Sequence, residues 1–224
     1  MTKIQTVPVI QFCQLWVLLL LCVVWLADAI AADDVEVKIT EKLPYLEIVH
    51  EGKTIRIERI QDTANQLNNS FAKTSRPCPP FCIHPIEIAP GVRTVGELEL
   101  LDFLSKQVRQ NTGLLVDARM PDWYEKGTIP GAINIPFTIL SAGLENPHTS
   151  RILKLLGAEE QDGKWNFANA RELLLFCNGM WCDQSPRAIN NLLSLGYPAE
   201  RLLWYRDGMQ SWQMLGLTVS VPEK

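Results

Sequence analysis

The stretch LLLFCNGMWCDQSPRAI, residues 173–189, decides the fold of this chain. Its first four residues, 173–176, are an apolar run of the kind found in strands buried on both faces of a parallel sheet. A polar loop follows, and Ser185 and the proline after it have the pattern of a helix N-cap and first helical residue. The stretch therefore predicts a strand, a loop and a helix, with the thiols of Cys177 and Cys182 in the loop.

Outward from this stretch, strand and helix patterns alternate over residues 94–224. The predicted strands lie at 114–116, 132–135, 173–176 and 201–205. The predicted helices lie at 94–108, 122–126, 151–156, 185–196 and 209–215. The first helix is expected to begin with a capping box, Thr94 to Glu97, and to turn residues 98, 101, 103, 104 and 108 towards the core. This alternation indicates a three-layer α/β domain around a central, largely parallel sheet.

Residues 33–92 have a different character and are interpreted as an N-terminal extension to a domain at 93–224. Two β-rich runs, 45–49 and 54–60, flank Glu51-Gly52-Lys53, which predicts a short β-hairpin. Residues 63–92 lack periodicity, and the stretch SRPCPPFCIHPIEIAPG contains five prolines, which favours a loop.

Residues 1–32 have the pattern of a signal peptide. Lys3 precedes an unbroken apolar run of twelve residues, 15–26, and Ala29-Ile30-Ala31 fits a cleavage site. Retention of this segment as a membrane anchor is the alternative. We expect an exported, periplasmic protein that is free of the membrane after signal cleavage. The net charge of -4 and the absence of any run of Lys and Arg argue against a nucleic-acid partner.

Signal cleavage would leave four of the six cysteines, in two close pairs. In an oxidising compartment such pairs are disulfides or redox-active thiols. For Cys78 and Cys82, with His84 nearby, we favour a small disulfide that clamps the proline-rich loop. A Cu(I) or zinc site and an exchange of electrons or sulfur with the second pair are the alternatives. His50 and His148 are expected to be surface residues.

Three stretches of the chain resemble the rhodanese family. They are LLVDARMPDWYEKGTIPGAINIPF (114–137), the strand, Cys177, loop and helix quoted above, and LLWYRDGMQSWQMLGLTV (202–219). They cover a little over half of the chain in the order that the family has. The resemblance implies the rhodanese-like fold and an enzyme that transfers sulfur through a persulfide on Cys177.

The resemblance also assigns roles to other residues. The loop that would bind substrate comprises Asn178, Gly179, Met180, Trp181, Asp183, Gln184 and Ser185. Asp117 and Arg119 match the family's Asp-x-Arg and are expected to form an ion pair beside the site. Trp212 matches a buried tryptophan of the core. Trp123 and Tyr124 are expected at the mouth of the pocket.

The cysteine loop departs from the family pattern Cys-x-x-Gly-x-Arg-Ser. It is two residues longer, it contains neither Arg nor Lys, and its nearest cation is Arg187 in the following helix. Asp183 adds a negative charge, so we expect poor use of thiosulfate as a donor. A Cys-x5-Arg phosphatase motif is also excluded, because position 183 is Asp. The setting of Cys177, at the end of a parallel strand and before a helix, nevertheless favours an anionic sulfur.

Cys182 leaves three functions open. It could resolve a persulfide on Cys177, form a protective disulfide with it, or form a static disulfide that holds the loop. The chain is thus interpreted as a sulfurtransferase or sulfur carrier. The alternatives are a thiol–disulfide oxidoreductase using Cys177 and Cys182, and a non-catalytic module that binds sulfur or a partner. No cofactor is expected, and the partners would be a small sulfur donor or acceptor, or a thiol protein; Trp181 would cover the sulfur or dock a partner.

Overall fold

A computed structural model describes residues 36–141, 143 and 147–222, and residues from Val37 onwards form one compact unit. The predicted signal peptide at 1–32 lies outside the described residues. The strands are β1 (Tyr45–His50), β2 (Lys53–Glu58), β3 (Arg93–Val95), β4 (Gly113–Asp117), β5 (Ala132–Asn134), β6 (Glu159–Gln161), β7 (Lys164–Asn166), β8 (Glu172–Phe176) and β9 (Leu202–Tyr205). The helices are η1 (Ser70–Ala72), α2 (Glu97–Phe103), η2 (Leu104–Val108), α3 (Pro121–Tyr124), α4 (Phe137–Leu140), α5 (Pro147–Leu155), α6 (Gln184–Ser194), η3 (Ala199–Arg201) and α7 (Gly208–Met214).

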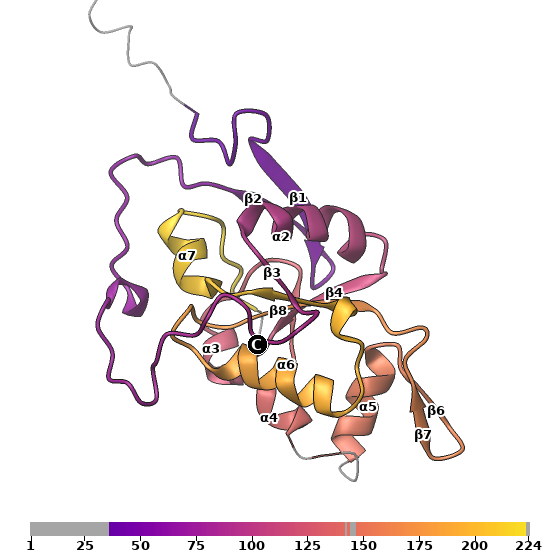
Figure 1. Cartoon of the computed structure of the whole chain (residues 1–224). Coiled ribbons are helices and arrows are strands. Elements are labelled where there is room, and N and C mark those ends of the chain that lie inside the picture. Colours follow the sequence, from indigo (N-terminus) through magenta and orange to yellow (C-terminus); the bar gives the residue numbers. More distant parts are fainter. Residues whose placement is uncertain (1–35, 142, 144–146, 223–224) are drawn as a thin grey trace, which may run out of the picture. The chain divides into compact units, whose positions relative to one another are not determined.

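A five-stranded parallel sheet in the order β3-β9-β8-β4-β5 forms the centre of the fold. Strand β8, which carries the apolar run 173–176, is the middle strand, as its sequence predicts. Helices α2 and α7 lie on one side of the sheet, and α4, α5 and α6 lie on the other (Figure 1). The predicted α/β fold with three layers is therefore confirmed.

Side chains alternate along the strands between two buried clusters. On β8, Leu174 and Phe176 pack with α2 and α7, whereas Leu173 and Leu175 pack with α5 and α6. All four side chains are fully buried. The period of two explains why the run is apolar at every position: each face of a parallel strand meets a layer of helices.

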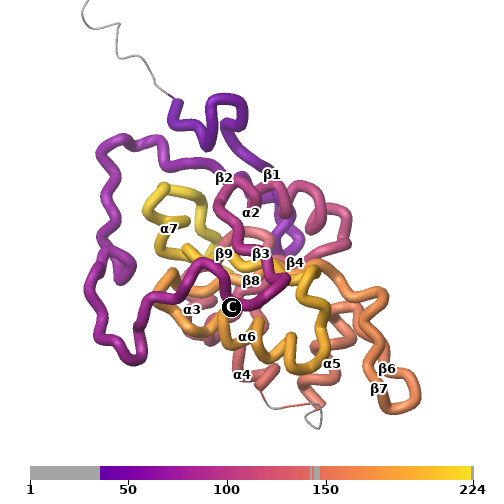
Figure 2. The backbone as a smooth tube through the Cα atoms, viewed as in Figure 1, coloured from indigo at the N-terminus to yellow at the C-terminus, as the bar shows by residue number. Residues whose placement is uncertain are grey.

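The predicted N-terminal hairpin is present as β1 and β2, paired antiparallel. It packs on the α2 and α7 side of the sheet through Ile48 and Ile57, and Arg59 bridges to Leu217 near the end of the chain. From β2 the chain follows a long path past η1 to β3, which Figure 2 traces from purple to magenta. Much of this path is loop, as the proline content predicts.

The predicted start of the first helix is wrong. Thr94 lies in β3, where it pairs with Trp204, and its hydroxyl donates to the carbonyl of Ile86. The helix begins at Glu97, and the side chain of Glu99 accepts a bond from the N–H of Gly96. Leu98, expected in the core, is 52% exposed as a result.

The sequence patterns did not predict β3, the hairpin of β6 and β7, or the short helix α4. None of the described helices is long and apolar enough to cross a membrane.

Candidate functional site

Cys177 lies where the central strand β8 ends, at the carboxyl edge of the sheet. The start of α7 holds its backbone in place: the N–H of Met209 donates to the carbonyl of Cys177 over 3.0 Å, and the N–H of Gln210 donates to that of Asn178 over 3.0 Å. Gly208 permits this approach, because its φ is +58° and a Cβ there would lie 2.3 Å from the Cys177 carbonyl oxygen. A parallel sheet places ligands at this edge, which is why a functional thiol fits the position.

Hydrogen-bond donors surround the Cys177 sulfur. The hydroxyl of Ser185 donates to Sγ over 3.0 Å, and the backbone N–H groups of Ser185 and Gly179 also point at it. Burial would raise the pKa of this thiol, but the hydrogen bonds from Cys182, Ser185 and the backbone outweigh burial and lower its pKa below the ordinary value. The loop thus has the donors that stabilise a thiolate.

Cys182 lies beside Cys177, and both are free thiols. The two side chains are hydrogen bonded, and in its thiol form Cys177 also donates to the backbone carbonyl oxygen of Cys182 over 3.3 Å. The pKa of Cys182 is raised, first by its hydrogen bond to Cys177 and then by burial. Backbone N–H groups of Asn178 and Gln184 also bond to its sulfur. With the pKa of Cys177 lowered and that of Cys182 raised, we expect Cys177 to be the thiolate of the pair.

Ser185 does not cap the helix, contrary to the sequence prediction. Helix α6 begins at Gln184, and Asp183 occupies the N-cap position without a side-chain cap bond. The Ser185 hydroxyl turns inward to the sulfur of Cys177 instead, and it accepts a bond from the indole N–H of Trp204 over 3.0 Å. The proline at 186 fixes the turn within the helix but does not determine where its cap lies.

Asp117 and Arg119 form a buried ion pair at the end of the neighbouring strand β4. Their side chains meet at 2.5 and 2.8 Å, and the hydroxyl of Thr128 completes the shell of the carboxylate at 2.8 Å. Arg119 also donates to the carbonyl of Gly127 and, over 3.4 Å, to the side chain of Asn178. The pair thus braces the residue that follows Cys177, while Asp117 neutralises the charge of Arg119.

Asp183 and Arg187 lie at the outer side of the loop. They form an ion pair of 3.7 Å, about half exposed, and the guanidinium of Arg187 stacks on the ring of Phe137. Gln184, the first residue of α6, has its side-chain oxygen buried without a hydrogen-bond partner. The negative charge of Asp183 is therefore partly offset by the cation that the sequence placed nearest to it.

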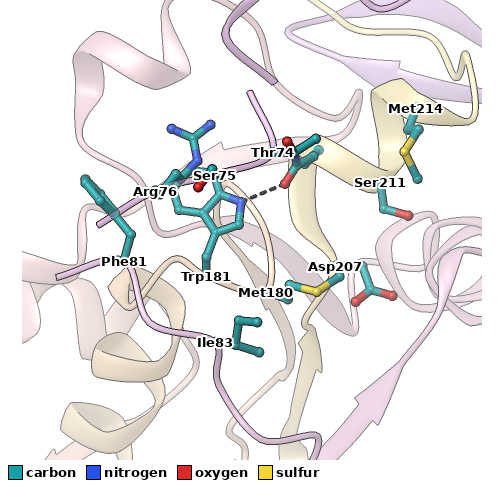
Figure 3. Close-up of a pocket in the computed structure, with 11 residues that line it drawn as sticks. Thr74, Ser75, Arg76, Phe81, Ile83, Met180, Trp181, Asp207, Ser211 and Met214 are labelled. Carbon is teal, nitrogen blue, oxygen red and sulfur yellow. Dashed lines mark hydrogen bonds between the residues drawn. The ribbon is translucent and has the colours of Figure 1, made fainter. Parts of the chain in front are cut away.

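A segment of the extension, residues 74–84, lies over the turn of the cysteine loop at Met180 and Trp181. We call it the covering segment. Arg76 stacks on the Trp181 ring at 3.8 Å, Phe81 meets the same ring edge-on at 5.7 Å, and the N–H of His84 donates to the carbonyl of Met180. Figure 3 shows Arg76 and Phe81 beside the indole of Trp181. Cys177 and Cys182 are only 1% and 5% exposed, so both sulfurs are closed to solvent in this arrangement.

A pocket of about 450 Å³ lies between the covering segment and α7. Its lining residues are Thr74, Ser75, Arg76, Phe81, Ile83, Met180, Trp181, Asp207, Gln210, Ser211 and Met214 (Figure 3). Gln210 joins the two sides: it accepts from the indole N–H of Trp181 over 2.6 Å and donates to the carbonyl of Phe71 over 2.7 Å. Of the predicted loop residues, Met180 and Trp181 reach this pocket, whereas Cys177 does not line it.

Cys78 and Cys82 are joined by a disulfide within the covering segment. Neither sulfur is then available as a thiolate ligand, and His84 is tied through its backbone to Met180 and to the side chain of Arg206. Within the part of the chain that the structure describes, no group of three or more His, Cys, Asp or Glu side chains could hold a metal ion. The disulfide interpretation, preferred from the sequence, agrees with this geometry.

Other sequence predictions fare differently. His50, expected on the surface, is buried, and its Nδ1 accepts a hydrogen bond from the N–H of Gly131 over 3.1 Å. His148 is exposed, as expected. Trp212 is in the core, as expected. Trp123 packs against Phe71 and the core instead of lining the pocket of Figure 3, and Tyr124 reaches towards Glu51.

Sequence reasoning did not identify Arg76, Phe81, Trp204 or Gln210 as parts of the site. Trp204 could have been suspected, because an indole N–H inside a buried strand requires an acceptor. The other three carry no such signal.

The chain matches the model of the rhodanese-like domain over residues 99–215, more than half of its length. It is 32% identical over 105 residues to the HTH-type transcriptional regulator Rv0324 of Mycobacterium tuberculosis, which covers 47% of this chain. The chain spans about a third of that relative's length, 36%. Among solved structures it is similar to the human single-domain sulfurtransferase TSTD1, with 24% identity, a TM-score of 0.38, and 55% of this chain and 96% of the other covered. It is also similar to thiosulfate sulfurtransferase from Pseudomonas aeruginosa, with 19% identity and a TM-score of 0.40. That match covers 59% of this chain and 21% of the other.

Proposed function

Because this chain belongs to the rhodanese-like family, we propose that it is a sulfurtransferase or sulfur carrier that works through a persulfide on Cys177. The observation that carries the proposal is the set of donors at the sulfur: the Ser185 hydroxyl and two backbone N–H groups. They stabilise the thiolate that must attack a donor.

The transfer has two balanced steps. The Cys177 thiolate attacks the sulfane sulfur of a donor, the donor's sulfur–sulfur bond breaks, and the remainder of the donor leaves as an anion. A nucleophilic acceptor then attacks the outer sulfur of the persulfide, which releases Cys177 as a thiolate. No net oxidation occurs, so no cofactor is needed.

Cys182 offers a second exit for the sulfur. Its thiol attacks the inner sulfur of the Cys177 persulfide, a Cys177–Cys182 disulfide forms, and hydrogen sulfide leaves with the two protons of the thiol and persulfide. The contact between the two side chains supports this step. A dithiol protein would then reduce the disulfide and return the site to its starting state.

A thiol–disulfide oxidoreductase is the second candidate, and the same contact favours it. One thiol of lowered pKa beside one of raised pKa is the arrangement in which the first attacks and the second resolves. The two candidates differ in whether sulfur is carried. A reversible dithiol–disulfide titration without bound sulfur would indicate the oxidoreductase.

The decisive experiment is mass spectrometry of the purified protein after incubation with a polysulfide. We expect the peptide that contains Cys177 to gain the mass of one sulfur atom, and cyanide to remove it as thiocyanate. Cys177→Ser should abolish both results with an unchanged melting temperature, because Ser is nearly isosteric. Sulfur loading that persists in this variant, or a mass loss of two hydrogens in place of the gain, would exclude the persulfide.

We also propose that the protein acts outside the cytoplasm, in the periplasm. The apolar run at 15–26 and the disulfide of Cys78 and Cys82 support this location, because such bonds persist in oxidising compartments. Cell fractionation with N-terminal sequencing tests it: we expect a mature chain that begins near residue 32 in the soluble periplasmic fraction. Recovery of the full-length chain with membranes would support the anchor instead.

A further inference from the structure

A chain of two hydrogen bonds leads from the core of the sheet to the Cys177 sulfur. The indole N–H of Trp204, on strand β9, donates to the hydroxyl oxygen of Ser185 over 3.0 Å. That hydroxyl donates to Cys177 Sγ over 3.0 Å. Trp204 and Ser185 are 0% exposed and Cys177 is 1% exposed, so water does not compete for either bond.

The chemistry of the groups fixes the direction of this chain. An indole N–H can only donate, so the Ser185 oxygen must be the acceptor of the first bond. The hydroxyl has one proton and two lone pairs, and the indole takes one of the lone pairs. The Cys177 thiol donates to the carbonyl oxygen of Cys182 at 3.3 Å, so the Ser185 proton is the one that forms the bond to Cys177 Sγ. A serine without this partner could rotate its proton towards another acceptor in the loop.

We propose that Trp204 is a positioning residue for the chemistry of Cys177: its indole N–H holds the Ser185 hydroxyl in the orientation that donates to the sulfur. The inference rests on the proposed function for its purpose, since a persulfide requires an attacking thiolate. Its geometry concerns only the thiol and can be tested without any sulfur transfer. Trp204 does not touch the sulfur and acts through Ser185.

The other groups that face the sulfur do not replace this effect. Cys182 is hydrogen bonded to Cys177, and the backbone N–H groups of Gly179 and Ser185 also point at it. The charges near the loop are paired with one another. Asp117 and Arg119 reach the loop through Asn178, Asp183 pairs with Arg187 at the outer side of the loop, and Arg206 pairs with Asp207 beside the start of α7. The Ser185 proton is therefore the one donor at the sulfur, among these groups, whose direction depends on a second side chain.

The test is the pH dependence of Cys177 alkylation by iodoacetamide in the reduced protein, followed on the Cys177 peptide by mass spectrometry. The midpoint gives the pKa of the thiol, while slow access through the closed loop changes only the absolute rate. A hydrogen bond to a charged group shifts a pKa by about one unit or more. We expect Ser185→Ala to raise the midpoint by about that amount and Trp204→Phe by roughly half a unit or more.

Trp212→Phe is the matched control. Trp212 is likewise 0% exposed and its indole N–H donates to a carbonyl, that of Thr218, over 2.8 Å. It should lose comparable stability and leave the midpoint unchanged. Trp204→Phe should add nothing in the Ser185→Ala background, because there is no hydroxyl left to orient. An unchanged midpoint in Trp204→Phe, or an equal shift in Trp212→Phe, would overturn the proposal.

A measurement on the unaltered protein guards against a Trp204→Phe variant that does not fold. The indole ¹⁵N–¹H resonance of Trp204 should titrate with the same midpoint as Cys177 alkylation, because a hydroxyl that donates to a thiolate is a stronger acceptor. The Trp212 resonance should stay in place over the same pH range. A Trp204 resonance that does not follow the thiol would contradict the proposed coupling. Sulfur loading plays no part in either measurement, so failure of the proposed function leaves this test intact.

Discussion

Gly208→Ala should disrupt the site from the side of α7. The new Cβ would lie 2.3 Å from the carbonyl oxygen of Cys177 and 2.7 Å from the nitrogen of Gly179. Both are backbone atoms, so no side-chain rotation relieves the contact. The loop or the helix must move by about 0.7 Å to restore even a tight contact of 3.0 Å. That movement stretches the two hydrogen bonds from the start of α7 to Cys177 and Asn178.

The loss in the free energy of unfolding is the sum of three contributions. Overpacking typically costs about 1–3 kcal/mol, and each weakened hydrogen bond about 1 kcal/mol. An L-residue at a φ of +58° costs about 1–2 kcal/mol more. Gly216→Ala serves as the control for the cost of the positive φ. Gly216 has a φ of +67°, but its added Cβ meets nothing closer than Ile60 at 3.6 Å. The difference between the two variants in the free energy of unfolding is therefore at least about 3 kcal/mol.

Calorimetry of the two variants measures this difference directly. For a chain of this size about 3 kcal/mol corresponds to a melting temperature roughly 6–12 °C lower for Gly208→Ala than for Gly216→Ala. Sulfur loading of Cys177 should fall in Gly208→Ala alone, because the loop has moved. Equal melting temperatures in the two variants would refute the argument that α7 and the cysteine loop meet through Gly208.

Three further results are expected. Asp117→Asn should destabilise the fold by about 3–5 kcal/mol in urea denaturation, because it leaves the buried charge of Arg119 uncompensated; a loss under about 1 kcal/mol would contradict the buried pair. Burial lowers the pKa of His50 below its usual 6.5, so the folded state binds fewer protons than the unfolded chain; stability is complete above pH 6.5 and declines as the pH falls below it, and His50→Gln should flatten this dependence of the urea midpoint. Cys182→Ser should lengthen the lifetime of the Cys177 persulfide if Cys182 resolves it, whereas an unchanged lifetime with a lower melting temperature would assign it a structural role.

The central strands could be predicted because burial on both faces leaves a strong signal in sequence. The run at 173–176 favours a strand buried on both faces, and as β8 it places Cys177 at the edge where the sheet ends. The ambiguity lies in small polar residues, which suit several positions. Ser185 and Asp183 both make good N-caps, and the sequence pattern did not show that one would be used at the sulfur.

The contacts of the extension could not be predicted, because they join residues far apart in the chain. His50 is the last residue of β1 and precedes an exposed turn, a pattern that predicts exposure, yet Gly131 lies against it. Arg76 and Phe81 lie in a stretch without periodicity, about a hundred residues before Trp181. Such pairs carry no local pattern, and only the folded arrangement reveals them.

The charged residues around the cysteine loop determine which sulfur donors the site is expected to accept. Asp183 was expected to repel thiosulfate, but it is paired with Arg187, and both are about half exposed. An exposed pair of this kind contributes only about 1 kcal/mol or less, so removing the carboxylate alone changes little. The stronger discrimination comes from what surrounds the sulfur: hydrogen-bond dipoles, with the charge of Arg119 already neutralised by Asp117. Dipoles suit a single negative charge at the sulfur, whereas a dianionic donor also needs a cation. We therefore expect a neutral or singly charged donor, such as an organic persulfide, to load Cys177 faster than thiosulfate, because the site lacks a cation for a second negative charge.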